Sequence, residues 1–230
     1  MKRSVSIVIP AWNEEERLAG TLQAIKQAGN PSEWETELIV VDDGSTDDTA
    51  FIAEPWADRL IRFPRNRGKG AALEAGWKAA SFPIVLFLDA DLGETAVHYP
   101  ALAYPVLSDE CDMSIAKLPP AATKGGFGFV KRLASLGIEH CSGFQASAPL
   151  SGQRAMRKAM LEELPPLGSG FGIEVALTID AVRRGFRLCE VEVPFRHRET
   201  ARDWSGFVHR GKQFFAVGRT LVSKWEMKKT

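Results

Sequence analysis

Residues 85–93 read Val-Leu-Phe-Leu-Asp-Ala-Asp-Leu-Gly, an apolar run that ends in two acids one residue apart. A short apolar run that follows Pro83 predicts a central strand that is buried on both faces. Because strand side chains alternate, Asp89 and Asp91 point to the same side at its carboxyl end. Open α/β sheets bind ligands at this edge. Repulsion between the two acids is most simply offset by Mg²⁺ or Mn²⁺, although a solvated turn would also accommodate them.

The composition is that of an ordinary globular protein. The 230 residues are 45% hydrophobic and 25% charged, which suits one sizeable α/β domain. Lys+Arg and Asp+Glu balance at 29 each, so we expect no nucleic-acid partner. The three widely spaced cysteines match neither a disulfide framework nor a zinc site. No apolar run approaches the roughly 20 residues that span a bilayer, so we expect a cytoplasmic protein.

Strands and helices alternate on the amino-terminal side of this run. The patterns predict strands at 4–10, 37–41 and 59–63, and helices between Asn13 and Gly29, after Asp47, and at 71–80. Pro10 should stop the first strand and Asn13 should cap the first helix, while Thr46 or Asp47 should cap the second. This alternation is typical of a parallel, doubly wound sheet with helices on both faces.

Polar residues follow three of the predicted strands, as Asn13-Glu14, Asp42-Asp43 and the Asp89/Asp91 pair. The carboxyl ends of parallel strands lie at one edge, so we expect these groups to converge. An acidic edge beside the Gly68-Lys69-Gly70 turn suits a nucleotide whose diphosphate is neutralised by a metal. The glycine patterns of dinucleotide-binding and P-loop proteins are missing from the sequence, which disfavours both classes.

Four motifs resemble family 2 glycosyltransferases in their order and spacing. They are residues 8–15 (VIPAWNEE), 40–47 (VVDDGSTD), 66–70 (NRGKG) and 88–91 (LDAD). Members of that family are inverting, metal-dependent enzymes of the GT-A fold that use UDP- or GDP-sugars. The resemblance is closest to the dolichyl- and polyprenyl-phosphate glycosyltransferases, with some likeness to glucosyl-3-phosphoglycerate synthases. It implies a Rossmann-like, mostly parallel α/β sheet with helices on both faces.

The resemblance also implies a role for each matching residue. The nucleotide would be bound by Pro10, Ala11, Asn13, Glu14, Asp42, Asp43, Lys69, Asp89 and Ala90, with Asp42 on the uracil or guanine. Asp91 would hold the catalytic metal that bridges the diphosphate, and Asp89 the metal or the ribose. Simpler interpretations stay open: Asn13 as only a helix cap, Asp43-Gly44 as only a turn, and Lys69 as a solvated lysine at a helix start.

The metal site is incomplete in the first half of the chain. Many relatives carry a ligand after the acid pair, but Gly93 has no side chain to offer. Glu94 is one substitute, or it only begins the next helix. His197, in the basic cluster at 195–204, resembles the late histidine that several GT-A enzymes add to the metal, and otherwise is a surface histidine.

The second half predicts strands at 112–118 and 186–194, a helical pattern at 96–107 broken at Pro100 and Pro105, and a loop over the site at 119–129. A stretch at 149–157 resembles the family's Ser-Gly-Phe-x-x-x-Arg. The predicted sugar- or acceptor-binding residues are Ser151, Gly152, Gln153, Arg154, Arg196 and Arg202. Glu174, which opens a helix that runs through Arg184, is the candidate catalytic base; its other interpretation is a favourable helix-dipole contact.

Residues 206–230 carry apolar and basic residues at helical spacing. Such a helix either lies on an anionic membrane or packs on its own domain or on a partner in a homodimer. We therefore expect one GT-A domain at 1–205, with a nucleotide-binding half at 1–95 and an acceptor half at 96–205, followed by this helix.

The predicted reaction is inverting transfer from a UDP- or GDP-sugar to a polyprenyl phosphate at the cytoplasmic face of a membrane. It would proceed as one in-line displacement at the anomeric carbon, assisted by Mg²⁺ or Mn²⁺. The alternatives are a soluble enzyme for a small phosphorylated acceptor such as 3-phosphoglycerate, and a sugar-nucleotide-binding protein without turnover.

Overall fold

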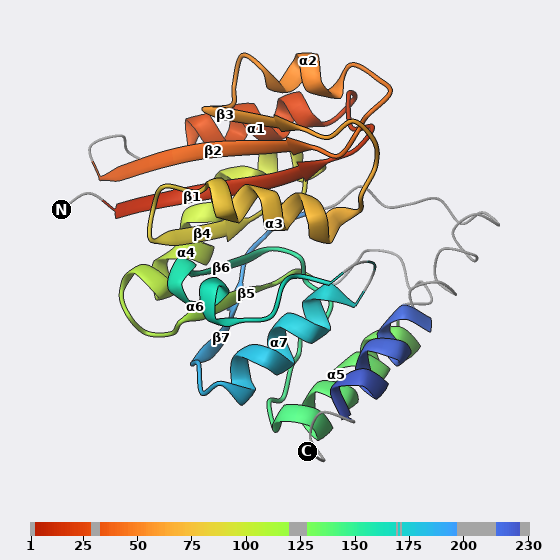
Figure 1. The fold of residues 1–230 in the computed structure, drawn as a ribbon. Helices are drawn as coiled ribbons and strands as arrows, with labels where there is room; N and C mark the ends of the chain where they lie inside the picture. Colours follow the sequence, from red (N-terminus) through yellow and green to blue (C-terminus); the bar gives the residue numbers. More distant parts are fainter. Residues whose placement is uncertain are drawn as a thin grey trace.

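The computed structural model describes residues 3–28, 33–119, 128–168, 170, 172–196 and 215–225 (Figure 1). The strands are β1 (Arg3–Ala11), β2 (Trp34–Asp42), β3 (Arg59–Arg62), β4 (Ile84–Phe87), β5 (Met113–Lys117), β6 (Arg154–Arg157) and β7 (Leu188–Glu192). The helices are α1 (Leu18–Gln27), α2 (Thr49–Ala53), α3 (Lys69–Ala79), the 3₁₀ helix η1 (Gly93–His98), α4 (Tyr99–Leu107), α5 (Gly128–Ser142), α6 (Lys158–Glu163) and α7 (Ile173–Arg183). Residues 215–225 form a further helix.

The strands form one seven-stranded sheet in the order β3-β2-β1-β4-β6-β5-β7. Strands β1, β2, β3 and β4 pair in parallel, and β5 pairs in parallel with β7. Strand β6 lies between β4 and β5 and is antiparallel to both. The mostly parallel α/β sheet expected from the sequence is therefore confirmed, with one reversed strand at its centre.

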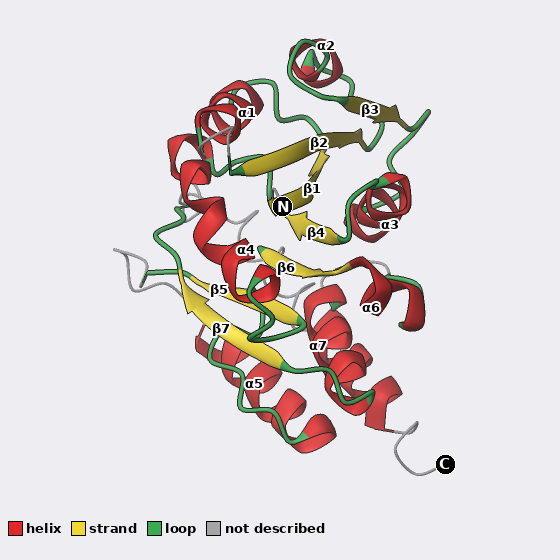
Figure 2. Ribbon diagram, turned by 90° about the vertical axis from the view of Figure 1, so that its left-hand side faces the viewer, coloured by secondary structure: helices red, strands yellow, loops and turns green. Residues whose placement is uncertain are grey.

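Helices cover both faces of the sheet, with α1 and α4 on one face and α3, α6 and α7 on the other (Figure 2). Each face has its own hydrophobic core, one containing Ile7 and Leu86, the other Val8 and Val85, all fully buried. The neighbours Ile7 and Val8 serve opposite faces because strand side chains alternate. The apolar run before Asp89 is therefore a strand buried on both sides, as predicted.

The expected ends or breaks of three segments are wrong. Strand β1 continues through Pro10 to Ala11, which pairs with Asp42 of β2. Helix α4 is not broken at its prolines, because Pro100 lies in the first turn, where its missing N–H is not needed, and Pro105 lies near the end. The predicted loop at 119–129 ends earlier than expected, since α5 begins at Gly128; residues 120–127 lie outside the described part of the chain.

The 215–225 helix packs on its own domain, beside α5 (Figure 1). Gly137 and Gly172 leave room for it, because a Cβ on either would lie within 2.3 Å of Leu221 or Thr220. The Lys224 ammonium contacts the Asp180 carboxylate of α7 at 2.7 Å, and both side chains are largely buried. Within the described ranges, the helices are all too short or too polar to cross a bilayer.

Candidate active site

A cavity of about 650 Å³ opens where β1 and β4 end. Its lining comes from both halves of the chain: Pro10, Ala11, Trp12, Glu14, Asp43, Asn66, Gly68, Lys69, Asp89, Ala90, Asp91, Val130, Leu150, Gly170, Glu174 and Val217. Eight of the predicted nucleotide and metal residues are among them, together with the candidate base Glu174. The structure thus brings together the groups that were expected to meet at the carboxyl edge of the sheet.

Lys69 joins two acids at the floor of this cavity. Its Nζ lies 2.7 Å from Oδ1 of Asp89 and 3.5 Å from Oε1 of Glu174. Burial alone would lower the pKa of Lys69, but the two carboxylates raise it above its ordinary value. Lys69 is therefore a permanent cation at neutral pH, and it links the strand end after β4 to the first turn of α7.

The segment before β6 covers this ion-pair cluster. Gln153 donates from Nε2 to Oδ2 of Asp89 at 2.6 Å. A Cβ on Gly152 would lie 2.6 Å from Nζ of Lys69 and 3.4 Å from the carboxylate of Asp89. A side chain at position 152 would therefore displace the Lys69 ammonium from its place beside Asp89.

Glu14 lies in the same electrostatic field as the acid pair. Burial raises its pKa, Arg17 at 3.1 Å lowers it, and the negative charges of Asp91 and Asp89 raise it again, so that the pKa of Glu14 stands above its ordinary value. Three carboxylates that repel one another across a cavity favour a cationic ligand.

The two neighbouring acids Asp42 and Asp43 have different places. Asp43 lines the cavity and accepts the backbone N–H groups of Arg67 and Gly68 at 2.7 and 2.8 Å. Asp42 does not line it: the side chain is 2% exposed and accepts the backbone N–H of Ser45 at 2.9 Å. Of these two acids, Asp43 therefore faces the cavity and Asp42 does not, and base binding by Asp42 stays a prediction.

Asn13 is exposed and does not cap α1, which begins at Leu18. Its Oδ1 instead accepts the backbone N–H of Thr46 at 2.9 Å, and its own N–H donates to Oγ of Ser45. Its φ of 55° is one that asparagine tolerates better than most residues. Asn13 thus fastens the loop after β1 to the loop after β2, at the rim of the cavity.

The described residues supply part of a metal site. Among them, no group of three His, Cys, Asp or Glu side chains is placed to hold a metal ion. Asp89 and Asp91 nevertheless provide hard oxygen ligands, and Mg²⁺ is commonly held by one or two carboxylates together with substrate phosphates. The residues present therefore fit a cation that is shared with a diphosphate.

The late basic cluster is described only at its start. His197 and Arg202, the predicted metal and acceptor ligands, lie outside the described residues. The exposed Arg196 donates its backbone N–H to Oγ1 of Thr95 at 3.1 Å. This bond places residue 196 beside η1, which directly follows the Asp91 loop.

The predicted acceptor residues at 151–154 do not all face the cavity. Gly152 and Gln153 touch Asp89 or its partner Lys69, whereas Arg154 is 1% exposed. The Arg154 guanidinium donates to the backbone carbonyl of Ser151 and to Oγ1 of Thr178, both at 2.9 Å. Burial lowers the pKa of Arg154 to about 10, although Glu174 and Glu190 act in the opposite direction. Direct acceptor binding by Arg154 is not what this geometry favours.

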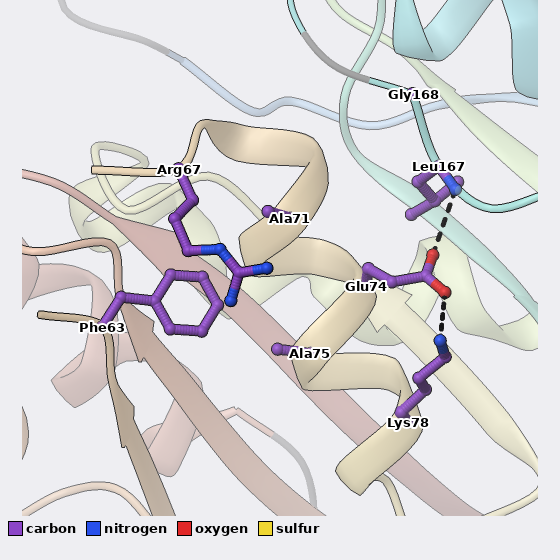
Figure 3. A pocket seen from close by; sticks show the side chains of 8 residues that line it. All are labelled: Phe63, Arg67, Ala71, Glu74, Ala75, Lys78, Leu167 and Gly168. Atoms are coloured by element: carbon purple, nitrogen blue, oxygen red, sulfur yellow. Dashed lines mark hydrogen bonds and ion pairs between the residues drawn. The ribbon is translucent and has the colours of Figure 1, made fainter. Parts of the chain in front are cut away.

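A second cavity, of about 390 Å³, lies on the outer side of α3 (Figure 3). The Glu74 carboxylate lines this cavity, accepts the backbone N–H of Leu167 at 3.0 Å and pairs with Lys78 at 2.7 Å. The Arg67 guanidinium stacks on the ring of Phe63 at 4.6 Å. The bond from Leu167 to Glu74 fastens the segment before α7 to α3.

Three apolar lining residues had no signal in the sequence. Val130, Leu150 and Val217 come from α5, from the loop before β6 and from the 215–225 helix. Each is an ordinary core residue by type, so only the tertiary packing shows that it faces the cavity.

Comparison with known proteins gives one matching family model, described as glycosyl transferase family 2, over residues 6–164. An uncharacterized glycosyltransferase of Mycobacterium tuberculosis is 32% identical over 200 residues, which cover 85% of this chain and 86% of that protein. The glucosyl-3-phosphoglycerate synthase of the same organism is 33% identical over 206 residues, covering 79% of this chain and 62% of that enzyme.

The fold is also similar to solved structures. A crystal structure of the M. tuberculosis glucosyl-3-phosphoglycerate synthase in complex with Mn²⁺, uridine diphosphate and glucosyl-3-phosphoglycerate aligns with a TM-score of 0.77 and 29% identity. The alignment covers 96% of this chain and 80% of that one. Another structure of the same enzyme contains Mg²⁺ and uridine diphosphate, with a TM-score of 0.76.

Proposed function

This chain belongs to glycosyl transferase family 2, and from that premise we propose that it transfers a sugar from a UDP-sugar to a small phosphorylated acceptor with the help of Mg²⁺ or Mn²⁺. The observation that carries the proposal is the cluster at the floor of the cavity. There, the Lys69 ammonium joins Asp89 to Glu174, and Asp91 lines the same cavity. A nucleotide sugar and an acceptor hydroxyl can therefore meet beside a carboxylate.

The donor nucleotide would occupy the side of the cavity formed by the strand ends. Asp43 and Glu14 are acceptor-only when ionised, and so suit the imide N–H of a uracil and the hydroxyls of a ribose. Pro10 and Ala11 line the cavity with them. Uridine rather than guanosine is supported by the uridine diphosphate in the solved relatives.

Asp91 would hold the cation, with Asp89 beside it and His197 as a further ligand. The backbone bond from Arg196 to Thr95 supports this choice of His197, because it fixes residue 196 near the loop that carries Asp91. When bound, the cation would neutralise the charge that develops on the departing diphosphate. Lys69 cannot supply that charge alone, since its ammonium is already engaged by two carboxylates.

Glu174 would act as the general base for a hydroxyl acceptor. The acceptor oxygen forms a bond to the anomeric carbon, the bond from that carbon to the diphosphate oxygen breaks, and the hydroxyl proton passes to Glu174. Attack from the face opposite the leaving group inverts the anomeric centre. The Glu174 side chain is 13% exposed, so water competes poorly for its carboxylate.

Two observations bear on the acceptor. The solved relatives with phosphoglyceric acid support a small phosphorylated acceptor. A second candidate, a polyprenyl phosphate, is favoured by the apolar side chains of Val130, Leu150 and Val217 on the cavity wall. These would contact an isoprenoid chain but give a small polyanion nothing to bind.

The deciding experiment measures release of uridine diphosphate from a UDP-sugar panel, with 3-phosphoglycerate, glycerol 3-phosphate and a short polyprenyl phosphate as acceptors. We expect Mn²⁺-dependent turnover, fastest with one of the small phosphates. Turnover only with the polyprenyl phosphate would replace the main proposal by the second. If no acceptor raises release above the slow hydrolysis of the donor, both acceptor proposals are wrong.

A further inference from the structure

Arg154 is the largest fully buried side chain among the described residues, and its hydrogen bonding is incomplete. Its Nη2 is buried and has no hydrogen-bond partner in the part of the chain that the structure describes. A buried guanidinium with an unsatisfied donor is costly, and an apolar side chain of similar size would commonly be as stable or more stable. Stability therefore does not explain an arginine here.

Two hydrogen bonds of the Arg154 side chain join it to the segment before β6 and to α7. Its Nε donates to the carbonyl of Ser151, the residue before Gly152. Its Nη1 donates to Oγ1 of Thr178, which in turn donates to the backbone carbonyl of Glu174 at 2.8 Å. One guanidinium thus connects the segment that covers Lys69 with the first turn of the helix that presents Glu174.

The other side of the same segment reaches Asp89. Gln153 donates to Asp89, and the Ser151 hydroxyl donates to Oε1 of Gln153 at 3.2 Å. Residues 153 and 154 therefore point to opposite sides of the segment, one to the predicted metal and ribose ligand, the other to the helix of the predicted base. Arginine donates here from two separate nitrogens, Nε and Nη1, whereas a lysine would have to reach both acceptors from a single nitrogen.

We propose that Arg154 is a positioning residue, which holds the 151–153 segment against the first turn of α7 so that Asp89 and Glu174 face the same Lys69 ammonium. The inference rests on the proposed function, since it gives Arg154 a role in that reaction. It assigns Arg154 no contact with the acceptor. Its loss should therefore change the rate of the chemical step rather than the affinity for either substrate.

The test compares Arg154→Met with Arg157→Met on the same strand. Arg157 contacts Asp109 at 2.7 Å and Asp112 at 3.3 Å, at the far end of β6 from the cavity, and so serves as a matched control. For Arg154→Met we expect kcat to fall by about 30-fold, with the KM values of donor and acceptor within about threefold of wild type. For Arg157→Met we expect a lower melting temperature and a kcat within about twofold of wild type.

Two further variants keep the inference testable if Arg154→Met does not fold. Thr178→Val removes only the hydroxyl between Arg154 and Glu174, and should lower kcat about fivefold at unchanged KM. Arg154→Lys should recover little of the lost rate, because one ammonium nitrogen cannot occupy the positions of both Nε and Nη1. A folded Arg154→Met with wild-type kcat, or with a raised acceptor KM alone, would overturn the inference.

Hydrogen exchange separates this inference from the proposed function. Amide exchange across residues 172–180 should be faster in Arg154→Met than in Arg157→Met, whether or not a substrate is turned over. If the wild-type protein has no transferase activity but this difference is seen, the proposed function fails while the structural part of the inference stands. Unchanged exchange in Arg154→Met would refute the positioning role even in an active enzyme.

Discussion

The two halves of the chain supply the same cavity in different ways. Up to Asp91, functional side chains follow the ends of parallel strands, as Glu14 follows β1 and Asp43 follows β2. Beyond Asp91, they come from a helix start at Glu174 and from the segment before the antiparallel strand β6. The first half fixes its residues by sheet topology, and the second fixes them by contacts between distant segments.

The difference shows in what holds each residue in place. Asp43 is fixed by two backbone N–H groups, those of Arg67 and Gly68, and so does not depend on a distant side chain. Glu174 depends on Lys69, on the Arg154–Thr178 link and on the attachment of Leu167 to Glu74. Substitutions in the second half should therefore disturb the site indirectly, by moving the residues that hold Glu174. Substitutions in the first half should act directly, by changing a side chain that lines the cavity.

The largest effect should come from Asp91→Ala. We expect the Mn²⁺-dependent gain in affinity for uridine diphosphate to disappear and kcat to fall by about a thousandfold, because the predicted metal ligand is lost. Calorimetry with and without Mn²⁺ measures the first effect, and Glu54→Gln, an exposed acid at the end of α2 that does not line the cavity, is the control. Metal enhancement that survives in Asp91→Ala would show that the cation is held elsewhere.

Glu174→Gln should reduce kcat by about a hundredfold while the affinity for uridine diphosphate stays within about twofold of wild type. The amide keeps the size of the side chain and loses the ability to take a proton. The effect should be specific for hydroxyl acceptors, because a phosphate acceptor is already anionic near neutrality. An equal loss with both acceptor classes would instead indicate that Glu174 organises Lys69.

The first half could be predicted from sequence because topology follows from local patterns. The run at 85–88 is apolar and short, which predicts a buried strand. The carboxyl ends of parallel strands all lie at the same edge of the sheet. That Asp89, Asp91 and Glu14 lie close together was therefore predictable. Asp42 and Asp43 could not be told apart, because their backbone conformation decides which carboxylate turns toward the cavity.

The second half resisted prediction because its signals are not local. Strand β6 has only the residues Arg-Ala-Met-Arg, with no β-branched residue and charges at both ends, and its sequence gives no sign that it enters the sheet reversed. Arg154 was predicted as an acceptor ligand because arginine suits phosphates, yet it is buried. The apolar wall formed by Val130 and Val217 depends on how helices pack, which composition does not determine.

Gly152→Ala should have an intermediate effect and sharpens the contrast between the halves. The added methyl would meet Nζ of Lys69 at 2.6 Å, so the flexible lysine must move away from Asp89. We expect kcat to fall about tenfold, with a change of less than about 1 kcal/mol in the free energy of unfolding. Gly143→Ala tests the opposite case, since its φ of 81° is strained for alanine but no atom is within 4 Å of the added methyl, and it should lower stability without slowing catalysis.

The smallest effect should separate Asp42 from Asp43. Asp43→Asn should raise the dissociation constant for uridine diphosphate about tenfold, or about 1.4 kcal/mol, because an amide can accept at only one of the two atoms that now bind Arg67 and Gly68. Asp42→Asn should leave that constant within about twofold and lower the melting temperature instead, since Asp42 is buried against Ser45. The reverse order of affinities would return base recognition to Asp42. It would then follow that the loop after β2 rearranges when a nucleotide binds, because only a rearrangement could bring a side chain that is 2% exposed to the cavity.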